Sequence, residues 1–113
     1  MAKAPLAVAL IATAGVLCAP IASADDIGFI VNTTLGPGSH FANAEQALSY
    51  GYGICDKIGA GVSYAQIVRD ARADLGELDE YQASYLIGQA ADQLCPSLIW
   101  QLRQSAAGYR PSQ

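Results

Sequence analysis

Two short stretches decide the fold, YGICD at residues 52–56 and QLCP at residues 93–96. Each contains one cysteine, and each lies in a segment whose apolar residues recur at the three- and four-residue spacing of an amphipathic helix. In an oxidising compartment these two cysteines are expected to pair. A Cys55–Cys95 disulfide would join two helices and close a loop of about 40 residues, which stabilises a chain by about 4 kcal/mol in the chain-entropy account. The alternative is two buried free thiols.

The N-terminus gives the reason to expect an oxidising compartment. Lys3 precedes a long apolar run at residues 5–21, and the small residues Ala22-Ser23-Ala24 follow it. A positive start, an apolar stretch and an A-x-A site are typical of a secretory signal peptide that is cleaved during export. We therefore predict a signal peptide at residues 1–24. An uncleaved anchor helix is the alternative, although the run is short for one.

A third cysteine, Cys18, lies inside the predicted signal peptide. A lipid-anchored cysteine follows a small residue, whereas Leu17 precedes Cys18. We therefore expect Cys18 to be removed with residues 1–24, which would leave Cys55 and Cys95 as the cysteines of the mature protein. The predicted location is secreted, in the cell envelope or the extracellular space.

The charge of the predicted mature protein excludes two classes of partner. The chain has 6 Lys and Arg residues, 10 Asp and Glu residues and a formal net charge of −4; losing residues 1–24 would make it −5, because one lysine and no acid would go. The basic residues are scattered along the sequence. An acidic domain without a basic stripe is not expected to bind nucleic acid or anionic membranes, and no stable membrane span is expected after cleavage.

Helical periodicity continues through the rest of the chain, and strand periodicity is absent. Helices are expected within residues 25–35, from the Asn43 cap to about Ile58, from Ser63 to about Gly76 and from Asp79 to Cys95. The last three begin with a capping-box pattern. Pro96 ends the fourth helix, and residues 97–102 can form a fifth. The prediction is an all-α bundle of four to five short helices over residues 25–104, followed by a frayed tail at residues 105–113.

Gly51 is expected on the buried face of the second helix, one turn before Cys55. Glycine inside an exposed helix costs about 1 kcal/mol relative to alanine. One use for such a glycine is the close approach of a second helix, which would bring the two cysteines together.

The spacing of these residues resembles that of a known family. The pattern consists of ALxxGxxIC at residues 47–55, GxS at 61–63, QA at 82–83 and AAxxLCP at 90–96. It looks like the small secreted proteins of mycobacteria and their relatives that are grouped as domain of unknown function 732 (DUF732). The resemblance covers residues 25–96 and implies an exported, disulfide-linked helical domain. It brings no established activity and no catalytic residues.

Neither a catalytic nor a metal site is expected. The mature chain has one histidine, His40, and no Gly-x-Ser-x-Gly motif. Asp70, Asp74 and Glu77 could form a carboxylate site, but two arginines interleave with them, as on an ordinary solvated helix face. One histidine and two cysteines are too few for structural zinc. We predict a protein that is not an enzyme and has no cofactor.

The aromatic residues are the candidates for function. Tyr81 and Tyr85 lie one helical turn apart, and Trp100 follows the second cysteine. Tyrosine and tryptophan favour interfaces because they combine an apolar body with a polar tip, although ordinary packing also uses them. We predict a non-enzymatic binding protein whose surface includes Tyr81, Tyr85, Trp100 and His40, with an unknown protein or small ligand outside the cytoplasm as partner.

The alternative function is a carrier for a small ligand such as haem or a lipid. Such a carrier would need a cavity between helices, which we would expect to be lined by Ile54, Tyr85 and Ile87 and open to His40. Histidine and tyrosine both occur as axial ligands of haem. An exposed aromatic patch would favour the binding protein, and an interior pocket would favour the carrier.

Overall fold

A computed structural model describes residues 24–35 and 41–111, and the predicted signal peptide before Ala24 and His40 lie outside these ranges. The described elements are α2 (Ala24–Leu35), α3 (Ala44–Gly59), α4 (Tyr64–Asp74), α5 (Glu80–Gln89), a π-helical turn η2 (Ala90–Leu94), a 3-10 turn η3 (Pro96–Leu98) and α6 (Ile99–Ala106). The described ranges contain helices and no strand, which confirms the all-α prediction. None of these helices is long and apolar enough to cross a membrane.

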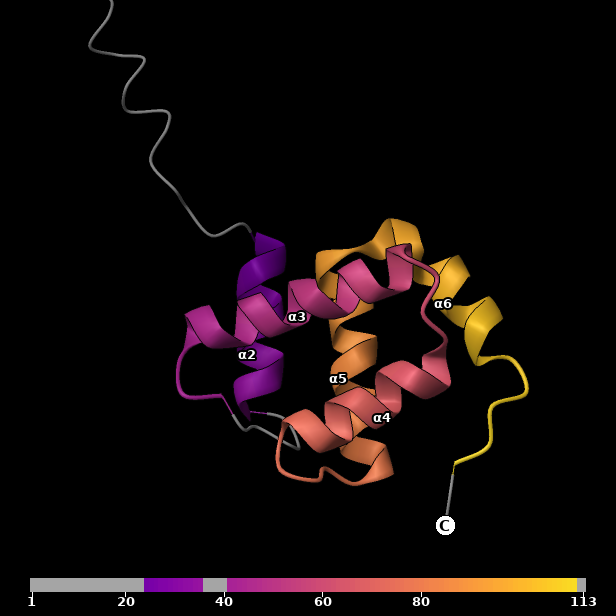
Figure 1. The fold of residues 1–113 in the computed structure, drawn as a ribbon. Coiled ribbons are helices and arrows are strands. Elements are labelled where there is room, and N and C mark those ends of the chain that lie inside the picture. Colours follow the sequence, from indigo (N-terminus) through magenta and orange to yellow (C-terminus); the bar gives the residue numbers. More distant parts are fainter. Residues whose placement is uncertain (1–23, 36–40, 112–113) are drawn as a thin grey trace, which may run out of the picture.

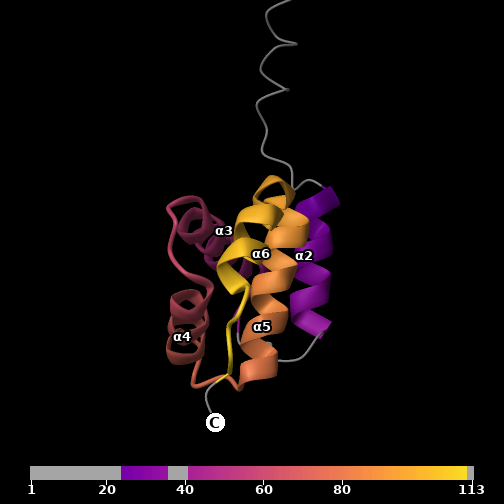
Figure 2. The same ribbon diagram turned by 90° about the vertical axis from the view of Figure 1, so that its right-hand side faces the viewer.

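The helices form two layers. α2 and α5 run side by side in one layer, and α3 and α4 lie across them in the other (Figures 1 and 2). α6 lies at the edge, against α3, α4 and η2. Apolar side chains at helical spacing fill the space between the layers, and their removal from water is the main force that favours folding. The largest buried side chains are Phe29, Ile67, Leu78, Ile87 and Val68.

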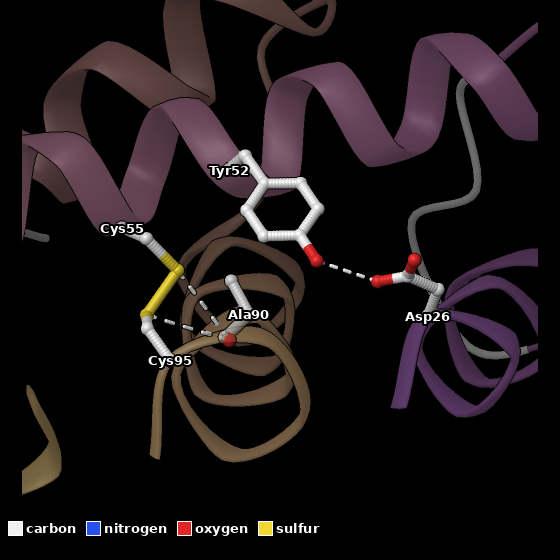
Figure 3. The surroundings of a disulfide bond; sticks show 5 residues. All are labelled: Asp26, Tyr52, Cys55, Ala90 and Cys95. Carbon is white, nitrogen blue, oxygen red and sulfur yellow. Dashed lines mark hydrogen bonds between the residues drawn. A yellow bond between two sulfur atoms is a disulfide. The ribbon is translucent and has the colours of Figure 1, made fainter. Parts of the chain in front are cut away.

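The predicted disulfide is present and joins the two layers. Cys55 of α3 is bonded to Cys95, which follows η2, with 6.1 Å between the two Cα atoms (Figure 3). The backbone N–H of Cys95 donates to the Ala90 carbonyl at 3.3 Å, and both sulfur atoms lie 3.7 Å from that oxygen. α5 therefore does not continue regularly to Cys95. Its last turn widens into η2, and this π-helical turn carries the second cysteine to α3.

Three helices begin with the predicted caps, but only one cap is a complete box. The side chains of Asn43, Ser63 and Asp79 each accept from a backbone N–H three residues later. Gln82 also accepts from the N–H of Asp79, which completes the third box. Gln46 instead accepts from the N–H one residue before its cap, so the reciprocal bond that the pattern predicts at Asn43 is displaced.

Replacing Asp79 with alanine should lower the free energy of unfolding by about 1 kcal/mol, the usual effect of deleting a cap. The N–H of Gln82, which donates to Asp79 at 2.7 Å, would lose its partner. In a domain of this size the melting temperature should fall by roughly 4–8 °C. The Asp79→Asn variant keeps an accepting oxygen, so its melting temperature should fall by much less. Equal losses in the two variants would contradict a capping role.

The C-terminal segment differs from the expected frayed tail. α6 continues to Ala106, and the Ser105 hydroxyl accepts from the N–H of Tyr64 at 2.6 Å. The ring of Tyr109 packs edge-on against Tyr64 with 4.9 Å between centroids, and its hydroxyl donates to the Glu80 carboxylate. These partners lie on α4 and α5, so local composition alone could not reveal them.

Candidate functional site

The predicted aromatic surface is divided between two parts of the molecule. Tyr81 is 66% exposed and its ring lies 6.4 Å from that of Tyr85, whose hydroxyl donates to the Asn32 carbonyl. Trp100 is 72% exposed on α6, where the Arg103 guanidinium lies 5.5 Å from its ring centroid. In the described part of the chain, α6 makes no close backbone approach to α5. The three residues therefore do not form one patch.

Ile54, Tyr85 and Ile87, which were expected to line an interior pocket, do not line the same pocket. Ile87 is fully buried in the core, and Tyr85 is bonded to α2 through its hydroxyl. Ile54 is 2% exposed, but it contributes to a groove whose lining does not include Tyr85 or Ile87.

This groove is open to solvent, has a volume of about 990 Å³ and runs along α3 to the end of α4. Its volume lies at the upper end of the range typical of ligand sites. The lining residues are Phe41, Asn43, Glu45, Gln46, Ser49, Tyr50, Gly53, Ile54, Lys57, Asp74 and Leu75. We call this surface the α3–α4 groove. It combines an apolar floor with polar and charged edges.

An aromatic pair and a carboxylate meet in the α3–α4 groove. The rings of Phe41 and Tyr50 are tilted, with 5.8 Å between their centroids. The Tyr50 hydroxyl donates to Oδ2 of Asp74 at 2.8 Å. Burial, and then the hydrogen bond and charge of Asp74, raise the pKa of Tyr50 well above its usual value. Tyr50 therefore stays protonated and holds the carboxylate beside the two rings.

Lys57, the one basic residue among the described lining residues of the groove, is already paired. Nζ of Lys57 lies 3.0 Å from Oδ2 of Asp70, and the Gln66 amide donates to Oδ1 of Asp70 at 2.7 Å. The bonds from Lys57 and then from Gln66 lower the pKa of Asp70. Since Asp70 balances the charge of Lys57, the carboxylates of Glu45 and Asp74 make the described lining of the groove acidic.

Internal packing does not explain the glycine at position 53, which lines the groove. A Cβ atom built there would have no neighbour within 4 Å, whereas at Gly51 it would meet Leu94 and Phe29 at 2.7 Å. Glycine within a helix costs about 1 kcal/mol relative to alanine. Gly51 is explained by the close approach of other elements, as predicted. Gly53 leaves the floor of the groove uncovered.

The three acids that could have formed a carboxylate site do not converge. Asp70 bonds Lys57, Asp74 bonds Tyr50, and Glu77 lies in the turn after α4 with a φ of 61°. Within residues 24–35 and 41–111, no group of three or more His, Cys, Asp or Glu residues could hold a metal ion.

Alkaline titration should reveal the unusual environment of Tyr50. The folded state binds the phenolic proton more tightly than the unfolded state, whose tyrosines ionise near the ordinary pKa of about 10. The stabilisation from this proton should be complete below pH 10 and decline as the pH rises above it. The pKa values of Tyr52 and Tyr109 are also raised, so the variants are compared: ultraviolet absorbance of phenolate should show one more late-ionising group in the wild type than in Tyr50→Phe.

The Asp74→Asn variant serves as a second test of that titration. It should lower the pKa of Tyr50 only part of the way, because burial is the largest cause of the shift. A wild-type Tyr50 that ionises like a free phenol would show that neither its burial nor its contact with Asp74 forms in solution.

A protein-family model matches most of the chain. The model described as "Protein of unknown function (DUF732)" matches residues 24–97, which include α2 to α5, both cysteines of the disulfide and all the described lining residues of the α3–α4 groove. Comparison with curated proteins and with solved structures found no match. The match extends from the first residue of α2 to just beyond Cys95.

Proposed function

We propose that this chain, which belongs to the DUF732 family of proteins of unknown function, is an exported, non-enzymatic protein that binds a partner outside the cytoplasm through the α3–α4 groove. The observation that carries the proposal is the combination of Phe41, Tyr50 and Asp74 beside the uncovered backbone of Gly53. Aromatic side chains with a few fixed polar groups are typical of recognition sites.

Two further observations support export. The order of Lys3, the apolar run at residues 5–21 and Ala22-Ser23-Ala24 is that of a cleavable signal peptide. The Cys55–Cys95 disulfide suits the oxidising conditions outside the cytoplasm. Export would place the groove where it meets envelope or extracellular partners.

The groove suits a partner segment better than an enclosed carrier. It is open along its length, and its edges carry Asn43, Ser49 and Lys57 in addition to the aromatic rings. A carrier for an apolar ligand would instead surround the ligand with apolar side chains. Of the large residues in the core cluster, Ile54 contributes to this groove, whereas Phe29, Ile67 and Ile87 do not line it.

Intact-mass spectrometry of the protein released by its host tests the export part of the proposal. We expect a mass that begins at Asp25, no thiol labelled before reduction and two labelled after it. A mass that retains residues 1–24, or a lipid adduct on Cys18, would contradict export with cleavage.

Site-specific photo-crosslinking in the same host tests the binding part. A photoreactive residue at Ser49, which lines the groove, should give a discrete adduct, and the same residue at the exposed Asp92 of η2 should not. Gly53→Leu fills the groove and should abolish the Ser49 adduct. Identical adducts from both positions, or a Ser49 adduct that Gly53→Leu leaves unchanged, would contradict binding at the groove.

A further inference from the structure

We infer that the partner of the α3–α4 groove is a basic peptide segment, and that an arginine side chain of this segment lies between the Phe41–Tyr50 rings and the Asp74 carboxylate. This inference rests on the proposed function and names the chemistry of its partner. Charge, aromatic geometry and groove length each support it.

The charge of the groove favours a cation. Glu45 and Asp74 are exposed acids among the lining residues, and Lys57 is compensated by Asp70 at 3.0 Å. The whole chain has the same sign, with a formal net charge of −4. An acidic protein attracts basic partners and disfavours acidic ones.

The hydrogen-bond geometry also favours a donor. The Tyr50 hydroxyl uses its proton on Oδ2 of Asp74, so the phenol oxygen and Oδ1 of Asp74 remain as acceptors. A phenol is protonated at neutral pH, so the Tyr50 hydroxyl can donate to Asp74 there. A guanidinium group supplies several N–H donors in one plane and can reach both oxygens of a carboxylate.

The aromatic pair selects arginine among the cations. The rings of Phe41 and Tyr50 lie 5.8 Å apart and 43° from coplanar, next to the carboxylate. A planar guanidinium stacks on an aromatic face while its edge pairs with a carboxylate, and this combination is less favourable for the compact ammonium of lysine.

The length of the groove fits a peptide. Its lining on α3 extends from Asn43 to Lys57, and with a rise of 1.5 Å per residue the helix covers roughly 20 Å over that range. An extended peptide advances about 3.3–3.6 Å per residue, so about six residues span the groove. The missing side chain at Gly53 lets the backbone or an apolar side chain of that peptide contact the floor near Ile54.

The test is a fluorescence-anisotropy titration of the disulfide-linked protein at physiological salt. The probes are fluorescein-labelled hexapeptides with alternating arginine and leucine, lysine and leucine, or glutamate and leucine. We expect the arginine peptide to bind most tightly, the lysine peptide more weakly and the glutamate peptide not at all. Binding of the arginine peptide by Asp74→Asn should be about fivefold weaker, as expected for loss of one partly solvated charge contact.

Asp92→Asn is the matched control. Asp92 is an exposed acid of η2 outside the groove, so this variant changes the net charge of the protein by the same amount. Asp74→Asn keeps an oxygen that can accept from Tyr50 and should fold normally, which circular dichroism can check. Phe41→Leu keeps an apolar side chain, removes the ring and should also weaken arginine binding.

Three results would overturn the inference: no binding of the arginine peptide, equal binding of the glutamate peptide, or equal losses in Asp74→Asn and Asp92→Asn. The last would indicate general attraction to an acidic protein. The proposed function is tested separately by the crosslinking experiment. If Ser49 gives a groove-dependent adduct but the arginine peptide is not preferred, the chain still binds a partner through the groove. Only the inference that this partner is a basic peptide would then be rejected.

Discussion

Removal of the Cys55–Cys95 disulfide should lower the free energy of unfolding by about 4 kcal/mol. The two cysteines are 40 positions apart, and in the chain-entropy account a closed loop of this length removes about that much conformational freedom from the unfolded chain. A typical domain is stable by 5–15 kcal/mol, and small domains lie near the lower limit. The disulfide is therefore expected to supply a large part of the net stability.

The measurement is urea unfolding followed by circular dichroism, for the oxidised wild type and for Cys55→Ala/Cys95→Ala. Alanine is the better replacement because Cys55 is buried and a serine hydroxyl there would add the penalty of a buried polar group. Reducing agent should destabilise the wild type to a similar extent and leave the double variant unchanged. If the double variant were as stable as the oxidised wild type, the disulfide would not be the main link between the layers.

The sequence was informative wherever a feature depends on residues close together in the chain. The three- and four-residue spacing of apolar residues predicted the helices, and the side chains at Asn43, Ser63 and Asp79 marked three helix starts. Each of these signals reflects interactions within one or two helical turns. The disulfide could be predicted despite its long loop, because two cysteines have only one way to pair.

The α3–α4 groove could not be predicted in the same way. Tyr50 and Asp74 are 24 positions apart. In the sequence around each of them, neither differs from an ordinary helix residue. Their contact depends on how α3 and α4 sit in one layer, which periodicity does not specify. Gly53 and Gly88 both lie inside helices without a packing partner, and of these two only Gly53 lines the groove, so the glycine alone does not mark the site.

The predicted aromatic surface failed as a single patch for a related reason. Tyr81, Tyr85 and Trp100 share a chemical character, but the irregular segment at Cys95 and Pro96 separates their helices and turns α6 toward α3 and α4. Composition indicated which side chains can form interfaces. It could not show that Tyr85 is bonded to α2 or that Trp100 pairs with Arg103.

Replacing Gly51 with alanine should destabilise the protein by about 1–3 kcal/mol, the usual range for overpacking a well-packed core. A Cβ atom at this position would lie 2.7 Å from Cδ1 of Leu94, 2.7 Å from Cζ of Phe29 and 2.8 Å from Cε2 of Phe29. Leu94 is only partly buried and can move, but Phe29 is fully buried and has little room. The strain should exceed the gain of up to about 1 kcal/mol that alanine brings to a helix.

The same substitution at two other helical glycines separates packing from helix propensity. A Cβ atom at Gly53 or Gly88 would meet nothing within 4 Å, so Gly53→Ala and Gly88→Ala should each raise stability by about 0.5–1 kcal/mol in urea unfolding. The effect of Gly51→Ala should also shrink in a Phe29→Leu background, because the smaller side chain relieves the contact. A stabilising Gly51→Ala, or an unchanged effect in that background, would mean that α2 and η2 do not approach α3 this closely. The fold would then depend on the disulfide, rather than on close packing at Gly51, to hold α3 against η2.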